Sequence, residues 1–159
     1  GVSSAASDVY KRQGLRDASS VLVLSCDPAP DYMRDQVVHG MKSLLGARCV
    51  DSVSTYFQYK SFPAELTTTL YGNGFSYARR LPAEYDSECD RSNLTERIAA
   101  HEFDLIVYGS CHRGMPFQEE VNAAYGPHEV AYVCGEDLHE CPYLTPEHAS
   151  KHVFIRELV

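Results

Sequence analysis

The sequence lacks the patterns that most readily identify membrane, nucleotide-binding or zinc-binding proteins. No stretch approaches the roughly 20 consecutive apolar residues that a membrane helix needs, so no membrane span is predicted. The phosphate-binding pattern GxxxxGK followed by Ser or Thr is missing, and no GxGxxG follows the first apolar run. These absences leave no support for a bound dinucleotide or nucleoside triphosphate. No CxxC pair occurs either, and the leading interpretation includes no cofactor and no metal ligand.

Basic residues are also scarce, with 14 Lys and Arg against 22 Asp and Glu, for a formal net charge of −8. A nucleic-acid backbone needs a basic stripe, so nucleic acid is not an expected partner. The six cysteines are an even number, but a domain with a proper core does not need disulfides. Most of them lie in or just after apolar runs, as buried free thiols do. We therefore predict reduced cysteines and a cytoplasmic location; the sequence does not indicate an oligomeric state.

Residues 3–13 read SSAASDVYKRQ, and their back-translation resembles, in a single frame, the adapter used in transposase-based sequencing libraries. We expect residues 1–13 to be a non-native, disordered leader that takes no part in the fold. Residues 14–159 are about one domain's worth of chain. We expect them to form a single Rossmann-like α/β domain, itself a fragment of a longer protein.

Five short apolar runs, each closed by small or polar residues, predict the strands of a buried parallel sheet. The predicted strands cover residues 20–25, 47–52, 104–108, 129–134 and 152–155. Helices are predicted over 32–45, 92–100 and 116–125, with Asp31 and Ser92 as N-caps of the first two, and a short helix should start at Thr145. The expected fold is a three-layer, Rossmann/flavodoxin-like α/β fold with about five parallel strands, in the order 2-1-3-4-5.

The stretch 53–90 interrupts this alternation, because it is rich in Tyr and Pro and has no sustained periodicity. Gly72-Asn73-Gly74 lies between β-favouring residues, which predicts a hairpin. A long insertion with little regular structure usually covers a site or is mobile.

Polar loops follow the first, third and fourth predicted strands, and the carboxyl ends of parallel strands meet at one edge of a sheet. The candidate ligand-binding residues are Asp27, Ser110, Arg113 and Asp137, and the candidate catalytic residues are His112 and Glu136. We expect Asp27, His112, Arg113 and Glu136 to line one concavity and to bind a small polar or sugar-like ligand.

Each of these side chains suits a particular task. The pKa of a histidine lies near neutrality, which suits His112 as a general base. The planar fork of Arg113 can grip an anionic or hydroxyl-rich ligand, with Glu136 balancing its charge in the empty site. Gly109 and Gly135 are expected to leave room for the ligand. Alternatively, His112 and Arg113 face solvent or pair with the acids of the neighbouring loop.

Two further interpretations involve the cysteines. Cys134, His139 and Cys141, with Cys111 or His112 from the neighbouring loop, have the ligand types of a tetrahedral zinc site, although the C-x4-H-x-C spacing is not a strong zinc pattern. Cys111 beside His112 is also a candidate nucleophile of a Cys-dependent or metal-dependent hydrolase.

Several segments resemble a known family when taken together and in order. They are HGMKSLLG (His39–Gly46), LYGNGFSYARRL (Leu70–Leu81), FDLIVYGSCHRGMPF (Phe103–Phe117), VAYVCGEDLH (Val130–His139) and HVFIREL (His152–Leu158). The set is similar to the N-terminal Rossmann-like domain of poorly characterised, glycosyltransferase-like proteins. In that family the fourth strand ends in Asp-Gly-Glu-Asp, whereas Cys134 stands at the first of these positions here.

The resemblance implies the acceptor-side half of a two-domain glycosyltransferase. In such enzymes the N-terminal domain generally contacts the acceptor, and a second domain holds most of the sugar nucleotide. We therefore expect no activity from this fragment alone. The alternative is a non-catalytic module of the same fold that binds a small ligand or a partner in the same cleft.

Overall fold

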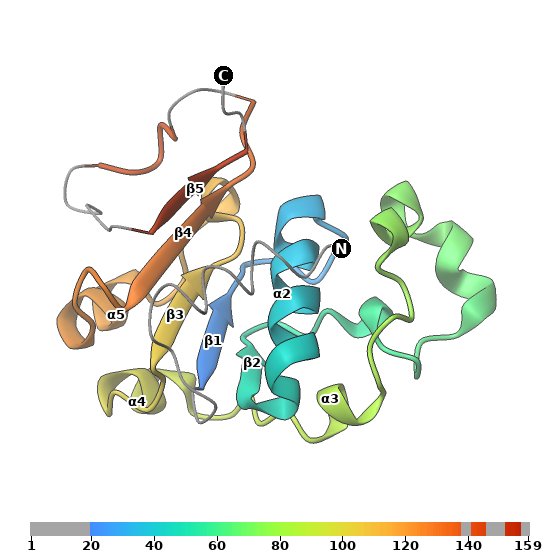
Figure 1. Cartoon of the computed structure of the whole chain (residues 1–159), viewed down its shortest axis with the longest axis horizontal. Coiled ribbons are helices and arrows are strands. Elements are labelled where there is room, and N and C mark those ends of the chain that lie inside the picture. Colours follow the sequence, from blue (N-terminus) through green and yellow to red (C-terminus); the bar gives the residue numbers. More distant parts are fainter. Residues whose placement is uncertain (1–19, 138–140, 146–151, 157–159) are drawn as a thin grey trace.

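The structure, a computed structural model, describes residues 20–137, 141–145 and 152–156. Its centre is an all-parallel sheet of five strands in the order β2-β1-β3-β4-β5 (Figure 1). The strands are β1 (Val21–Leu24), β2 (Cys49–Asp51), β3 (Leu105–Tyr108), β4 (Val130–Cys134) and β5 (Val153–Ile155). The predicted fold class and strand order are confirmed. The leader and most of the short helix predicted from Thr145 lie outside the described residues.

Helices cover both faces of the sheet and make the domain three-layered. The helix α2 (Tyr32–Leu45) packs through Val38, Met41 and Leu45 on one face. On the other face lie α4 (Leu94–Ala99) and α5 (Gln118–Ala124), which contribute Leu94, Ile98 and Val121 to a second apolar cluster. In the described residues, no helix is long and apolar enough to cross a membrane.

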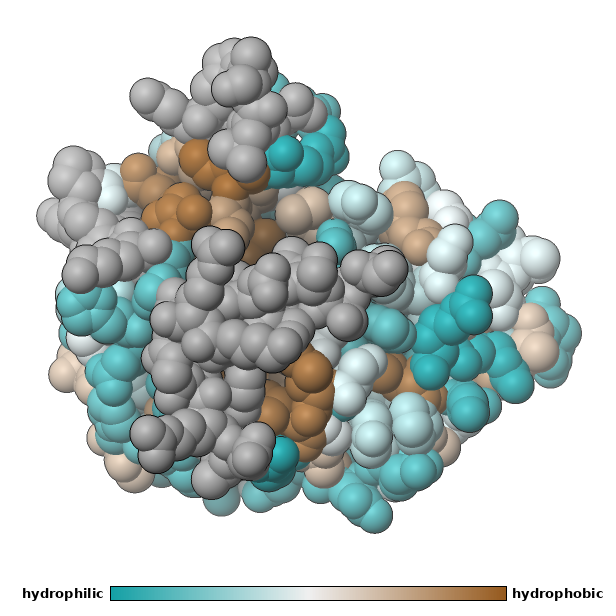
Figure 2. Space-filling view, viewed as in Figure 1, coloured by the Kyte–Doolittle hydropathy of each residue, from teal (hydrophilic) through white to brown (hydrophobic). Residues whose placement is uncertain are grey.

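The inner strands are buried on both faces, as their unbroken apolar runs predict. Val21 and Val23 are fully buried, and the other residues predicted to be buried are at most 7% exposed. Those others are Leu105, Val107, Ala131 and Val133. The edge strand β5 differs, because Val153 and Phe154 are each 38% exposed. Figure 2 shows hydrophobic side chains gathered over this part of the sheet.

The helix α2 begins and ends where its sequence predicts. The Asp31 carboxylate accepts hydrogen bonds from the backbone N–H groups of Met33 and Arg34, both at 3.1 Å, which makes Asp31 the N-cap. Gly46 ends the helix with a φ of 61°, a positive angle that glycine adopts without strain.

Charged side chains also lie on the buried face of α2, which the apolar stripe did not predict. The Lys42 ammonium lies 2.9 Å from the Asp51 carboxylate at the end of β2, and both side chains are at most 1% exposed. Arg91 reaches the same carboxylate at 2.7 Å, and Tyr59 donates its hydroxyl to it at 3.2 Å. This cluster attaches the insertion to the sheet, because Tyr59 lies within the insertion and Arg91 directly follows it.

The insertion, residues 53–90, contains 3-10 turns and the short helix α3 (Glu84–Ser87), and the predicted hairpin is wrong. Gly72, Asn73, Gly74 and Phe75 all have left-handed backbone conformations, with φ between 48° and 67°. Four consecutive residues in this region coil the chain instead of letting two strands pair. Within the insertion, Tyr59 and Leu81 form an isolated bridge. Figure 1 shows the insertion, in teal to green, on the β2 side of the sheet.

Two helix starts also differ from the prediction. The α4 helix begins at Leu94 after a left-handed Asn93, and the Ser92 hydroxyl donates to Asp90 at 2.6 Å instead of capping the helix. The α5 helix begins at Gln118 after a left-handed Phe117. In both cases, a left-handed residue reverses the chain before the helix can start.

Replacing Leu105 by Ala should lower the free energy of unfolding by about 2–5 kcal/mol, because the substitution removes buried apolar contacts and leaves a cavity. Leu105 is 3% exposed in the central strand, whereas Leu66 in the insertion is 44% exposed and serves as the control. A urea melt measures both variants. A loss below about 0.5 kcal/mol for Leu105→Ala would contradict this placement.

Replacing Asp51 by Asn should cost about 3–5 kcal/mol, because Lys42 would remain buried without its counter-charge. Burial raises the pKa of Asp51, but the charges of Lys42 and Arg91 outweigh it, so the folded pKa lies below its ordinary value. The ion pair therefore stabilises the fold above the ordinary pKa of about 3.9, and this contribution is lost as the pH falls through the lower folded pKa.

Urea melts at neutral and acid pH test this second prediction. Asp51→Asn should show a shallower loss of stability in acid than the wild type. Glu65→Gln, at an exposed side chain of the insertion, should behave like the wild type. Equal acid sensitivity of Asp51→Asn and the wild type would contradict the assignment.

Candidate functional site

A cavity of about 270 Å³ lies at the carboxyl ends of β1 and β3. Its lining residues are Ser25, Cys26, Asp27, Ala29, Pro30, Asp31, Arg34, Tyr71, Ser110 and Arg113. The strand order runs from β1 to β2 in one direction and from β1 to β3 in the other. The cavity therefore lies at the point where the order reverses, which is where open α/β sheets bind their ligands.

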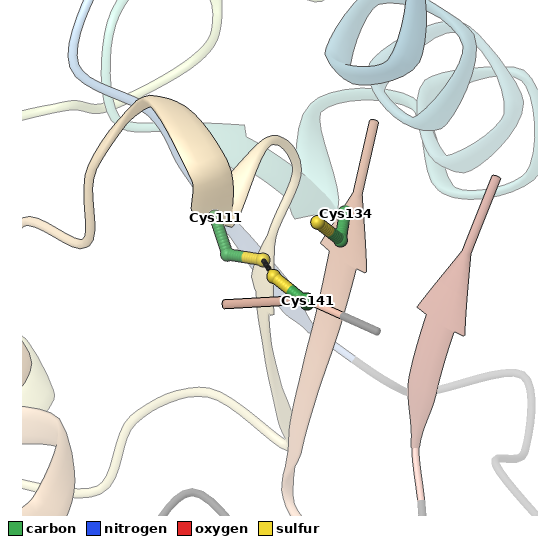
Figure 3. Close-up of side chains that lie close together, drawn as sticks. All are labelled: Cys111, Cys134 and Cys141. Carbon is green, nitrogen blue, oxygen red and sulfur yellow. Dashed lines mark hydrogen bonds between the residues drawn. The ribbon is translucent and has the colours of Figure 1, made fainter. Parts of the chain in front are cut away.

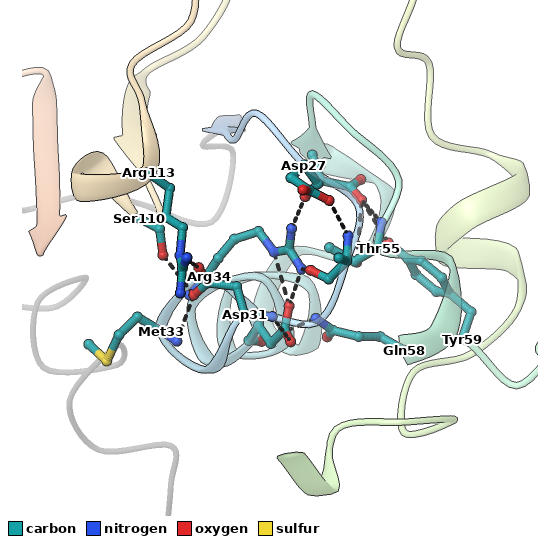
Figure 4. Close-up of polar contacts among 12 residues, drawn as sticks. Asp27, Asp31, Met33, Arg34, Thr55, Gln58, Tyr59, Ser110 and Arg113 are labelled. Atoms are coloured by element: carbon teal, nitrogen blue, oxygen red, sulfur yellow. Dashed lines mark hydrogen bonds and ion pairs between the residues drawn. The ribbon is translucent and has the colours of Figure 1, made fainter. Parts of the chain in front are cut away.

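The Asp31 carboxylate joins the two loops that form this cavity (Figure 4). One oxygen, which caps α2, also accepts the Ser110 hydroxyl at 2.8 Å, and the other accepts Nε of Arg113 at 3.0 Å. Burial raises the pKa of Asp31, but the hydrogen bonds from Arg34 N–H and Ser110 and the charges of Arg34 and Arg113 outweigh it. The net pKa lies below the ordinary value, so this acid is ionised at neutral pH.

The buried side chain of Arg34 holds the loop between β1 and α2 through hydrogen bonds to the loop backbone. Its side chain is 2% exposed and pairs with Asp35 at 2.6 Å. Its guanidinium also donates to the backbone carbonyls of Asp27 and Ala29 (Figure 4). A Cβ atom on Gly109 would lie 3.0 Å from Cγ of Arg34. The space left by the missing side chain of Gly109 is therefore filled by Arg34, and not by a ligand as was expected.

The insertion contributes one side chain to the cavity, Tyr71. It is 75% exposed, and its ring packs edge-on against Phe75 with the ring centres 5.5 Å apart. An aromatic face is thus available beside the polar loops. Tyr71 thus brings part of the insertion to the cavity, in line with one of the two roles expected for it, covering a site or being mobile.

The structure brings together only part of the predicted site. Asp27, Ser110 and Arg113 line the cavity, whereas His112, Glu136 and Asp137 are not among its lining residues. Arg113 pairs with Asp31 and not with Glu136. Arg113 pairs with Asp31 because Asp31 caps α2, and this position holds its carboxylate directly beside the loop that follows β3.

The remaining predicted residues join loops to one another. His112 accepts a hydrogen bond at Nδ1 from the Gly135 N–H at 3.0 Å. A Cβ atom on Gly135 would lie 2.7 Å from both His112 and Met33, so this glycine also leaves no room for a ligand. Glu136 accepts the Tyr143 hydroxyl at 3.4 Å, and Asp137 forms an ion pair with Arg156.

The electrostatics of these groups favour binding over acid–base chemistry. Burial, with a contribution from Arg113, lowers the pKa of His112, and its Nδ1 is already engaged. Burial and the charge of Asp27 raise the pKa of the Cys26 thiol. Burial also raises the pKa of the Cys111 thiol, which does not fit a nucleophile, since the thiolate is the reactive form.

Arg34, Asp31 and Tyr71 are cavity residues that sequence reasoning did not select. Arg34 and Asp35 fall on the same helical face as the buried Val38 and Leu45, so charges within an apolar stripe were a usable signal. Asp31 was recognised only as a cap. No periodicity marks Tyr71, because it lies in an irregular insertion.

Comparisons with protein-family models, with curated proteins and with solved structures found no match to this chain.

Asp31→Ala should lower the free energy of unfolding by about 0.5–2 kcal/mol through loss of the N-cap. Asp31→Ser is the matched variant, because serine also caps helices but cannot pair with Arg113. Asp31→Ser should keep most of the stability, yet both variants should speed amide hydrogen exchange in residues 110–113. Unchanged exchange there would show that Asp31 does not hold the two loops together.

Proposed function

We propose that this domain binds a hydroxyl-rich, sugar-like ligand in the cavity between β1 and β3. We further propose that it is the acceptor-side half of a two-domain glycosyltransferase. One observation carries the proposal: the exposed ring of Tyr71 lies at the same cavity as the Arg113 fork and the Asp27 carboxylate. Pockets that bind small molecules combine apolar surface with a few convergent polar groups.

The polar groups of the cavity can form hydrogen bonds with the hydroxyl groups of a sugar. Nε of Arg113 pairs with Asp31, while within the described residues its two Nη atoms have no hydrogen-bond partner. The buried Ser25 hydroxyl likewise has no partner in the part of the chain that the structure describes. Asp27 presents an exposed carboxylate. These groups supply donors and acceptors for hydroxyls, and the Tyr71 ring supplies an apolar face for the carbon-bound hydrogens.

The state of the acids supports a binding role for this half. Asp31 is held ionised by its partners, and burial and the charge of Asp27 shift the pKa of the Cys26 thiol upward, away from neutrality. A non-catalytic ligand-binding module of the same fold is therefore the second candidate.

The six cysteines are all free thiols, which supports the proposal of a reduced, cytoplasmic location.

Titration of the isotopically labelled protein with methyl glucoside or with glucuronate tests the proposal by NMR. Saturable shifts should centre on the amides of Ser25, Tyr71 and Ser110. Arg113→Ala should weaken binding about tenfold, because a hydrogen-bonding fork is lost, with little change in the melting temperature, since exposed ion pairs add little stability. Tyr71→Ala should also weaken binding.

Arg80→Ala and Tyr56→Ala are the matched controls. Arg80 is an exposed arginine whose Nε is engaged, by the Ser76 carbonyl, and Tyr56 is 43% exposed. Neither lines the cavity, so neither substitution should alter binding. Binding that survives both cavity substitutions, or an Arg113→Ala variant that unfolds without a ligand effect, would contradict the proposal.

A further inference from the structure

Three cysteines from separate parts of the chain converge beside the 3-10 turn that follows β3 (Figure 3). Cys111 lies in the 3-10 turn after β3, Cys134 ends β4, and Cys141 begins the described segment 141–145. All three are at most 6% exposed. Their Sγ atoms all lie within 4.8 Å of one another, and those of Cys111 and Cys141 are 3.8 Å apart.

We propose that Cys111, Cys134 and Cys141 bind one zinc ion through three thiolates. This inference is independent of the proposed ligand cavity, and it departs from the sequence prediction that the chain contains no metal ligand. His139, one of the ligands considered in the sequence, lies outside the described residues.

The sulfur separations fit zinc coordination. Zinc–sulfur bonds of about 2.3 Å in a tetrahedron place two sulfurs about 3.8 Å apart. Cys111 and Cys141 already have this separation, and the other pairs need to close by about 1 Å at most to reach the same geometry. Thiolate ligands also favour zinc over magnesium or calcium, which prefer oxygen.

A disulfide explains the cluster less well. The bond between two sulfurs is about 2.05 Å long, and it would leave the third buried thiol without a role. Zinc binding needs no oxidant, because each coordinating thiol gives its proton to solvent and zinc stays divalent. Three thiolates around Zn²⁺ have a net charge of −1, and one tetrahedral position remains for an oxygen or nitrogen donor.

The ion would fix two segments that lie outside the longer helices and strands, namely the loop after β3 and residues 141–145. Cys111 directly follows Ser110, which lines the cavity, so zinc would anchor the same loop. It would also attach residues 141–145 to the end of β4. The site is therefore structural, since its ligands are buried and lie outside the cavity lining.

Cobalt titration of the full chain, stripped of metal with a chelator and kept reduced, tests the proposal. One equivalent of Co²⁺ should produce a thiolate-to-cobalt charge-transfer band, and Zn²⁺ should abolish the band by displacing cobalt. The melting temperature should rise on addition of zinc. Cys111→Ser, Cys134→Ser and Cys141→Ser should each lose the band, whereas Cys89→Ser, at a buried cysteine outside the cluster, should keep it.

X-ray absorption of the wild-type protein with one equivalent of zinc avoids any dependence on how the variants fold. It should show three sulfur neighbours at about 2.3 Å and one lighter donor. A shell of oxygen and nitrogen alone would overturn the proposal. So would the absence of a cobalt band in the reduced wild type, or a band that survives the loss of any of the three cysteines in a folded variant.

Discussion

The Asp31 carboxylate is the constraint on which the candidate site depends. It ends the loop after β1 by capping α2, and it holds the loop after β3 through Ser110 and Arg113. These two loops belong to neighbouring strands of the sheet and form most of the cavity lining. The relative position of the two loops that line the cavity therefore depends on one short, ionised side chain. Its partners lie at the start of α2, after β1, and in the loop after β3.

Buried charge positions the surrounding elements. Arg34 and Asp35 hold the loop after β1, and Asp51, paired with Lys42, attaches the insertion to the sheet through Tyr59. Apolar residues of similar size often stabilise a fold as well as buried ion pairs do, so such pairs are weak evidence for stability. Their contribution here is directional, because a guanidinium or carboxylate fixes the loops that donate to it or accept from it. The Tyr71 ring, which lines the cavity, belongs to this attached insertion.

The sheet could be predicted because its inner strands are unbroken apolar runs that end in small or polar residues. Burial of Val21 and Leu105 follows from such runs alone. The insertion could not be predicted, since the left-handed backbone at Asn73 and Phe75 follows no periodic pattern. The site was predictable in part: strand ends locate Asp27, Ser110 and Arg113, but which acid pairs with Arg113 depends on the tertiary position of α2. A convergence of cysteines from three separate segments likewise needs the fold.

We propose that the cavity between β1 and β3 binds a sugar through the face of Tyr71. Intermolecular nuclear Overhauser effects between methyl glucoside and the protein measure this contact directly. We expect effects from the ring hydrogens of the sugar to the aromatic hydrogens of Tyr71, and their loss when an excess of glucuronate competes. Effects confined to an exposed tyrosine outside the cavity, such as Tyr143 at 46% exposure, or no effects at saturating sugar, would contradict sugar binding at Tyr71.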